Sequence, residues 1–170
     1  MKTLRLGKDT VTLASVIEVA ARRMRVELDP AAESRITSIR RRIDALLDDD
    51  APNVYGVNTG FGALAAVRVG ASDLKRLRQN RIRSHATGIG EPFSEPVTRA
   101  IMLLRANVLM LGTSGVRVVV PRLLVDMLAA GVHPIIPEKG SVGASGDLAP
   151  LAHLALVLIG EGEAIYQGRR

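Results

Sequence analysis

A stretch of small residues near the C-terminal end of the chain holds the residue types best suited to chemistry. It reads Gly140-Ser141-Val142-Gly143-Ala144-Ser145-Gly146-Asp147 and precedes an apolar run, Leu151 to Ile159, that is typical of a buried helix. Glycine loses more backbone freedom than any other residue on ordering, so a loop this rich in glycine needs a compensating gain in free energy from another interaction. Two explanations are open at this point: anion binding at the N-terminus of the helix, or chemistry on the backbone itself.

The triplet Ala144-Ser145-Gly146 permits one particular backbone reaction. If a tight turn presses the amide nitrogen of Gly146 against the carbonyl carbon of Ala144, a five-membered ring closes with loss of water. Loss of the Ser145 hydroxyl as a second water then gives a methylidene-imidazolone, a strong electrophile. Asp147 follows directly and is placed both to cap the helix and to assist proton movements. A lone Ala-Ser-Gly triplet is weak evidence, because all three residues are common.

A second glycine-rich stretch runs from Tyr55 to Gly62 and follows a short strand expected at Val54. One interpretation is a surface turn with a half-buried tyrosine. The other is a mobile loop that carries Tyr55 over a site, where glycines let the backbone pass close to a ligand. The segment alone does not choose between them.

Ser84 and His85 close a helix that we expect to begin at Ser72. At about 100° per residue, one face of this helix carries both apolar and chemically active side chains: Leu74, Leu77, Arg81 and His85. His85 therefore points the way the leucines point. On this pattern alone, a core histidine is favoured over a functional one.

Composition excludes several kinds of site. The chain has no cysteine, so it has neither disulfides nor thiolate chemistry. Its three histidines, His85, His133 and His153, are scattered and give no metal-ligand spacing, so we expect no metal. The net charge of +6 raises the possibility of nucleic-acid binding, but only 2% of the residues are aromatic and the arginines lie at helical spacing, which favours solvated helix faces. With no signal peptide and no apolar run of about 20 residues, we expect a cytoplasmic protein that neither binds nucleic acid nor enters a membrane.

Helical periodicity dominates the rest of the chain and predicts a mainly α-helical fold with a few short strands. Thr12 is the expected N-cap of a first helix, and Asp29-Pro30 opens a second one whose arginines 40–42 turn mostly outward. Residues 95–111 form a helix that is apolar nearly all round and is therefore expected to be buried on most sides. Pro121 is the expected first residue of the next helix. The expected strands or extended pieces are 3–6, a short piece at Val54 that runs into the glycine-rich loop, 134–137 and the segment after Gly160.

Three motifs in this order resemble the aromatic amino acid ammonia-lyases, with the best match to the histidine-specific enzymes: residues 55–62, 84–90 and 140–153. The resemblance covers essentially the whole chain. It implies the N-terminal domain of that fold, which carries the 4-methylidene-imidazol-5-one (MIO) group and leads towards a bundle of long helices. It also implies that Ala144-Ser145-Gly146 cyclises autocatalytically to form this prosthetic group, with no metal.

The resemblance also assigns roles to the other candidates. The position of Tyr55 is that of the base that removes the β-proton, and the backbone at Gly62 is expected to lie against the substrate. Ser84-His85 matches the selectivity site, where histidine-specific enzymes carry Ser-His, tyrosine-specific ones His-Leu and phenylalanine-specific ones Phe-Leu. An imidazole that hydrogen-bonds another imidazole is a sound way to select histidine. The resemblance thus reverses the core-histidine interpretation of His85.

The implied activity is non-oxidative elimination of ammonia from L-histidine to give urocanate. Family members are much longer, so residues 1–170 are expected to form one incomplete domain that lacks the family's carboxylate-binding arginine. A complementary C-terminal lyase region or chain, and assembly into a homo-oligomer such as a tetramer, would complete the site. We expect the isolated chain not to mature its MIO. The alternative is an inactive fragment or partner subunit that docks on other lyase chains; a basic nucleic-acid binder ranks last.

Overall fold

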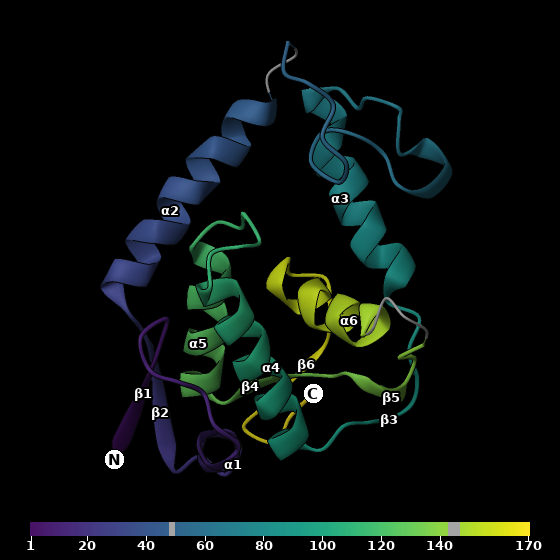
Figure 1. The fold of residues 1–170 in the computed structure, drawn as a ribbon. Helices are drawn as coiled ribbons and strands as arrows, with labels where there is room; N and C mark the ends of the chain where they lie inside the picture. Colours follow the sequence, from purple (N-terminus) through teal and green to yellow (C-terminus); the bar gives the residue numbers. More distant parts are fainter. Residues whose placement is uncertain (48–49, 143–146) are drawn as a thin grey trace.

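Helices separated by short strand pairs make up most of the structure (Figure 1). The computed structural model describes residues 1–47, 50–142 and 147–170. Within these ranges the α-helices are α1 (Leu13–Ala20), α2 (Pro30–Asp44), α3 (Ala71–His85), α4 (Glu95–Met110), α5 (Val119–Ala130) and α6 (Leu148–Leu158). The strands are β1 (Lys2–Leu6), β2 (Met24–Leu28), β3 (Ile89–Pro92), β4 (Val132–Pro134), β5 (Pro137–Lys139) and β6 (Ala164–Tyr166). The expectation of a mainly helical fold with a few short strands is confirmed.

The N-terminal unit is a parallel pair, β1 and β2, joined through α1, with Lys2 opposite Met24 and Leu6 opposite Leu28. Thr12 begins α1 as expected. Its hydroxyl accepts from the Ser15 amide, and the Ser15 hydroxyl accepts from the Thr12 amide, which forms a capping box. The buried face is that of Ser15 and Val19, whereas the apolar side chains of Leu13 and Ile17 are exposed.

Helix α4 is the centre of the core and packs against α1 and α5. Its buried side comprises Thr98, Arg99, Met102, Leu103, Ala106, Leu109 and Met110. The opposite side is open, since Leu104 is 47% exposed and Val108 is 42% exposed. The expectation that α4 would be buried on most sides is borne out from residue 98 to residue 110, where every side chain other than these two is buried or half-buried.

Helix α2 extends away from this core (Figure 1). The Asp29 side chain accepts from the Ala32 amide and Pro30 occupies the first turn, as the sequence predicted. Arg41 and Arg42 are exposed, but Arg40 turns inward, where it pairs with Asp44 and donates from Nη1 to the Gly115 carbonyl at 3.1 Å. The Gly115 carbonyl, in the loop after α4, thus accepts a hydrogen bond from a guanidinium that helical periodicity alone would place in water.

Helix α3 packs on α6, and the loop that precedes it lies beside its N-terminal part (Figure 1). The short strand expected at Val54 is absent; turns occupy residues 55–58, and an isolated bridge between Thr59 and Arg68 follows them. The cap of α3 is Gly70 rather than Ser72.

Helix α5 begins at Val119, two residues before the expected start at Pro121. Proline is compatible with this position because the amides of the first helical turn have no partners within the helix.

The C-terminal part consists of two antiparallel pairs, β3 with β5 and β4 with β6, with α6 between β5 and β6 in sequence. Strand β5 ends at Lys139, directly before Gly140, so it delivers the chain into the small-residue stretch. The extended pieces expected near residues 134–137 and after Gly160 are thus present. No described helix combines the length and apolar character needed to cross a membrane.

Candidate active site

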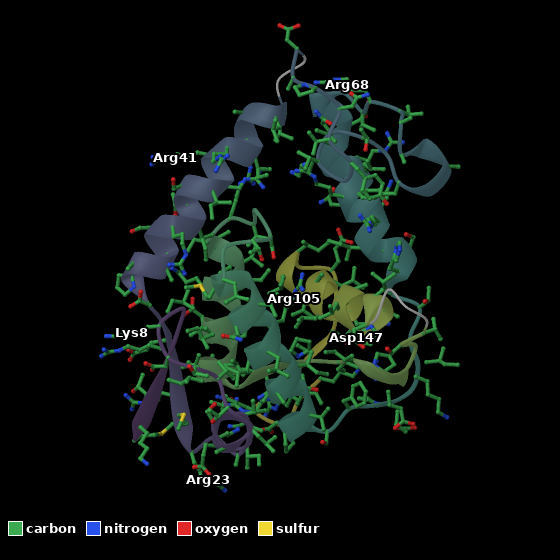
Figure 2. All side chains as sticks on the ribbon, viewed as in Figure 1. Lys8, Arg23, Arg41, Arg68, Arg105 and Asp147 are labelled. Carbon is green, nitrogen blue, oxygen red and sulfur yellow. The ribbon has the colours of Figure 1, made fainter. Side chains whose placement is uncertain are left out.

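The residues that flank the Ala144-Ser145-Gly146 triplet are held together. The Ser141 hydroxyl donates to the Asp147 carboxylate, with Oγ and Oδ1 2.8 Å apart. The triplet itself lies outside the described residues. Asp147 stands at the N-cap position of α6 (Figure 2) and its carbonyl accepts from the Leu151 amide, but its side chain makes no capping hydrogen bond. The expected capping role of the Asp147 carboxylate is therefore wrong, because Ser141 engages it instead.

The stem of this stretch lies directly against the segment that follows His85. Gly140 has φ of +153°, and a Cβ placed there would lie 3.0 Å from the Gly88 Cα and 3.1 Å from the Ala149 Cβ. Only a glycine lets the two backbones approach this closely. The contact joins two of the three sequence motifs, because Gly88 belongs to the motif of Ser84-His85.

A further link joins Gly88 to α6. Its amide donates to Nε2 of His153 at 3.0 Å, and burial lowers the pKa of this half-buried histidine. Sequence reasoning assigned no role to His153. The one available signal was its position, six residues after Asp147, inside a motif that already attracted attention.

His85 sits at the last position of α3 and is half-buried. Its Nδ1 lies 2.8 Å from the Arg81 carbonyl oxygen and 3.1 Å from the Ser84 hydroxyl, which itself donates to the same carbonyl. A carbonyl oxygen can only accept, so the proton of the neutral ring is on Nδ1. Nε2 is then left as a hydrogen-bond acceptor.

Tyr55 reaches α3 through Phe61. The two rings meet edge to face with centroids 5.8 Å apart, and the Arg81 guanidinium lies 3.6 Å from the centroid of Phe61. Aromatic and cation–π contacts of this kind stabilise by about 1 kcal/mol each. Tyr55 is 65% exposed, and its hydroxyl has no hydrogen-bond partner among the described residues. The loop and His85 are thus fixed to one helix, while no described hydrogen bond or ring contact links Tyr55 to Ser141 or Asp147.

Gly62, the last candidate of this loop, has φ of +57°, and the space where a Cβ would lie is open within 4 Å. It begins a short 3₁₀ turn, Gly62–Leu64. The backbone at Gly62 is therefore exposed rather than packed against the described part of the chain.

The loop is anchored by Asn58, which sequence reasoning missed. Its side chain is 1% exposed; Oδ1 accepts from the Val54 amide at 2.7 Å, and Nδ2 donates to the Leu46 and Pro52 carbonyls at 2.9 Å each. Asparagine among glycines is typical of a solvated turn, so its burial was not predictable from the local sequence. Among the described residues no cluster of histidine or carboxylate side chains could hold a metal ion.

Comparison with known proteins identifies the family. The sequence model of the aromatic amino acid lyase family matches residues 11–170 of this chain. The chain belongs to the aromatic amino acid lyase family. The resemblance carried by the three sequence motifs is thereby confirmed.

The curated relatives of this lyase-family chain include histidine ammonia-lyases. It is 53% identical over 162 residues to the enzyme of Myxococcus xanthus (strain DK1622), covering 95% of this chain and 32% of the relative. It is 55% identical over 164 residues to the enzyme of Anaeromyxobacter sp. (strain K), and the match covers 96% of this chain and 32% of that relative. The chain therefore spans about a third of the length of these relatives and corresponds to their N-terminal portion.

Solved structures agree on the fold. Histidine ammonia-lyase from Trypanosoma cruzi superposes with a TM-score of 0.86 at 35% identity, over 99% of this chain and 32% of that one. Tyrosine aminomutase from Streptomyces globisporus gives a TM-score of 0.88 at 35% identity, over 98% of this chain and 31% of that one. The described chain thus has the fold of the corresponding third of both enzymes.

Proposed function

We propose that this chain supplies the N-terminal part of the active site of an enzyme that eliminates ammonia from L-histidine to give urocanate. The histidine ammonia-lyases that share more than half of its residues support the reaction and the substrate. The observation that carries the proposal is the contact between Gly88 and Gly140. It holds the segment of Ser84-His85 against the stem of Ala144-Ser145-Gly146.

The described residues around the triplet fit a MIO group. Ser141 and Asp147 bring its two flanks within hydrogen-bond distance, which suits a compressed turn. A MIO formed there would supply the electrophile that makes the substrate's amino group able to leave. Asp147 is held by Ser141 and is exposed, so its carboxylate is available to accept or return a proton beside the triplet.

Tyr55 fits the base that removes the β-proton of the substrate. The residue is exposed and its hydroxyl has no hydrogen-bond partner among the described residues, so no internal bond must break before the hydroxyl acts. The contact of Phe61 with Arg81 keeps the loop on α3. The open backbone of Gly62 is suited to lie against the substrate, because no Cβ intervenes.

His85 is suited to recognise the substrate imidazole. With its proton on Nδ1, its Nε2 accepts a hydrogen bond from a ring N–H of histidine. A phenyl ring cannot donate this bond and would leave Nε2 unpaired. Sites built to hydrogen-bond a substrate group reject analogues that lack this group by about 10⁴- to 10⁵-fold. His85 is thus proposed as the selectivity residue, with Ser84 fixing its ring.

The proposed enzyme is completed by a C-terminal lyase region and by assembly of several copies, with residues 1–170 as one MIO-bearing domain. A test is coexpression of this chain with the region of the Myxococcus xanthus relative that it does not cover. We expect the complex to form urocanate from histidine, and the intact mass of this chain to fall by two water molecules. Ser145→Ala should abolish both, and His85→Leu should lower kcat/KM for histidine with the mass loss retained.

Three results would contradict this proposal. A folded complex in which this chain keeps its full mass would exclude the MIO. Release of no urocanate from histidine by a mature complex would exclude the substrate, and formation of a β-amino acid instead would indicate an aminomutase.

One observation favours the second candidate, an inactive chain that docks on other lyase chains. Helix α4 leaves Leu104 and Val108 exposed, and Leu111, its C-cap residue, is exposed as well; a group of large apolar side chains of this kind is typical of an interface. This candidate predicts a stable complex with a full-length relative in which the chain is never dehydrated. The same intact-mass measurement therefore separates the two functions.

A further inference from the structure

His153 and Gly88 are connected across the candidate site by a hydrogen bond between residues 65 positions apart, with the Gly88 amide donating to Nε2 at 3.0 Å. His153 lies on α6, the helix that begins directly after Asp147. Gly88 lies three residues after His85. The bond thus connects α6, which follows the Ala144-Ser145-Gly146 triplet in sequence, to the segment that follows Ser84-His85.

Gly88 is also confined on its other sides. A Cβ at this position would lie 3.1 Å from the His153 Nε2 and 3.2 Å from the Pro137 Cβ. The Gly140 position would bring its own Cβ within 3.0 Å of the Gly88 Cα. Gly88 is therefore held between Gly140, which precedes the triplet, and His153, which follows it.

The bond requires one protonation state of His153. A backbone amide can only donate, so Nε2 must be an unprotonated acceptor. Burial, which lowers the pKa of His153, favours this neutral form. No side chain other than His153 makes a described hydrogen bond to the Gly88 amide, so loss of the imidazole would leave that half-buried amide without its described partner.

We propose that His153 is a positioning residue for the elimination: its Nε2 holds Gly88, and through it Ser84-His85, in a fixed position relative to Gly140 and α6, which flank the triplet in sequence. This inference rests on the proposed function. His153 does not touch substrate in this role. Its removal would let the segment after α3 move, so that His85 meets the substrate imidazole less often in the productive place.

The hydrogen bond is tested by NMR on this chain, without catalysis. The Gly88 amide should exchange slowly with solvent in the unchanged chain and in His153→Gln, whose amide oxygen can accept in place of Nε2. In His153→Phe, which keeps a ring of similar size without an acceptor, the exchange should be at least about tenfold faster, as expected for loss of one hydrogen bond. Val157→Ala is the matched control, since it removes packing from the same helix without a polar contact.

The positioning role is tested by kinetics of the complex completed with the C-terminal region. His153→Phe should raise KM for histidine about tenfold and leave kcat nearly unchanged, because it weakens substrate placement rather than the chemical step. His153→Gln should restore KM to within about twofold of the unchanged enzyme. Val157→Ala should leave KM unchanged even where it lowers stability.

Two results would overturn the positioning role: equal Gly88 exchange in all four chains, or equal KM for His153→Phe and His153→Gln. If the unchanged complex forms no urocanate at all, the proposed function fails and the positioning role fails with it. The NMR result would still show whether the bond between His153 and Gly88 exists. The two failures are therefore distinguishable.

Discussion

The buried guanidinium of Arg99 lies against the imidazole of His133, with Nη1 3.3 Å from Nε2. Arg99 also donates to the Val19 carbonyl at 3.1 Å and to the Leu128 carbonyl at 2.9 Å. Because a guanidinium can only donate, His133 must present an unprotonated Nε2. One arginine of α4 thus ties α1, α5 and β4 together.

Removal of this guanidinium should destabilise the fold. Arg99 is 4% exposed, and Arg99→Met removes the side-chain donor from the Leu128 carbonyl and from His133, whereas the Val19 carbonyl keeps the Arg22 amide as a donor. We expect a loss of about 2–4 kcal/mol in the free energy of unfolding, measured by urea titration. Arg105→Met on the same helix is the control, because Arg105 has no described polar partner; it should change stability by about 0.5 kcal/mol or less. Equal effects of the two changes would refute the role of Arg99.

The stability of the chain should fall with acid through His133. Burial, with Arg99 and Arg22 adding to it against the opposing charge of Glu95, lowers the pKa of His133 below its ordinary 6.5. The unfolded chain then binds more protons than the folded one as the pH falls below 6.5. The contribution of His133 to the free energy of unfolding should therefore be nearly constant above that pH and fall below it, down to the lowered pKa.

The contribution of His133 can be isolated from that of His153, whose pKa is also lowered by burial. Urea titrations at about pH 7 and about pH 5 span the window in which histidines titrate. His133→Asn should reduce the acid-induced loss of stability, with His153 and, near pH 5, carboxyl groups of lowered pKa such as Glu95 accounting for the remainder. An unchanged loss in His133→Asn would show that His133 does not titrate differently on folding.

Gly140 should tolerate no side chain. Gly140→Ala adds a Cβ that meets the Gly88 backbone at 3.0 Å, at a φ that L residues rarely adopt. We expect a loss of about 2–4 kcal/mol from strain and overlap together. Gly168→Ala is the control for φ alone, since φ is +74° but the added Cβ meets nothing within 4 Å. If both substitutions cost the same in a thermal or urea denaturation series, the contact with Gly88 contributes nothing.

Ser141 should assist maturation of the triplet without contributing much to folding. Ser141→Ala removes the hydrogen bond to Asp147 between two exposed residues. In the completed complex we expect dehydration to slow about fivefold, which corresponds to one hydrogen bond of about 1 kcal/mol. Intact mass over time after synthesis measures this, with exposed Val142→Ala as the neighbouring control. Equal rates in the two variants would refute the effect.

The capping box of α1 should contribute measurably to the free energy of unfolding. Thr12→Ala removes the side-chain acceptor for the Ser15 amide and should cost about 1 kcal/mol in urea titrations. Thr37→Ala on α2 is the control, because its hydroxyl only bonds back to the Glu33 carbonyl within the helix and contributes little. A smaller loss at Thr12 than at Thr37 would contradict the capping role.

The limits of prediction follow from the range of the interactions. The caps at Thr12 and Asp29 are local, since each is formed by a side chain and an amide three residues away, and both were predicted. The cap of α3 was misplaced at Ser72 because Gly70 begins the helix without any side-chain bond that a sequence pattern could reveal. The capping role of Asp147 was wrong because Ser141 competes for its carboxylate.

The sequence by itself determined the helical character of the chain, the caps of α1 and α2, and the order of the three motifs that mark the lyase family. These are local properties of side-chain chemistry and spacing. The tertiary structure alone decided that Gly88 lies between Gly140 and His153, that Asn58 is buried, and that Arg99 faces His133. Each of those depends on groups brought together from distant parts of the chain, where buried donors and acceptors must find partners that no local pattern specifies.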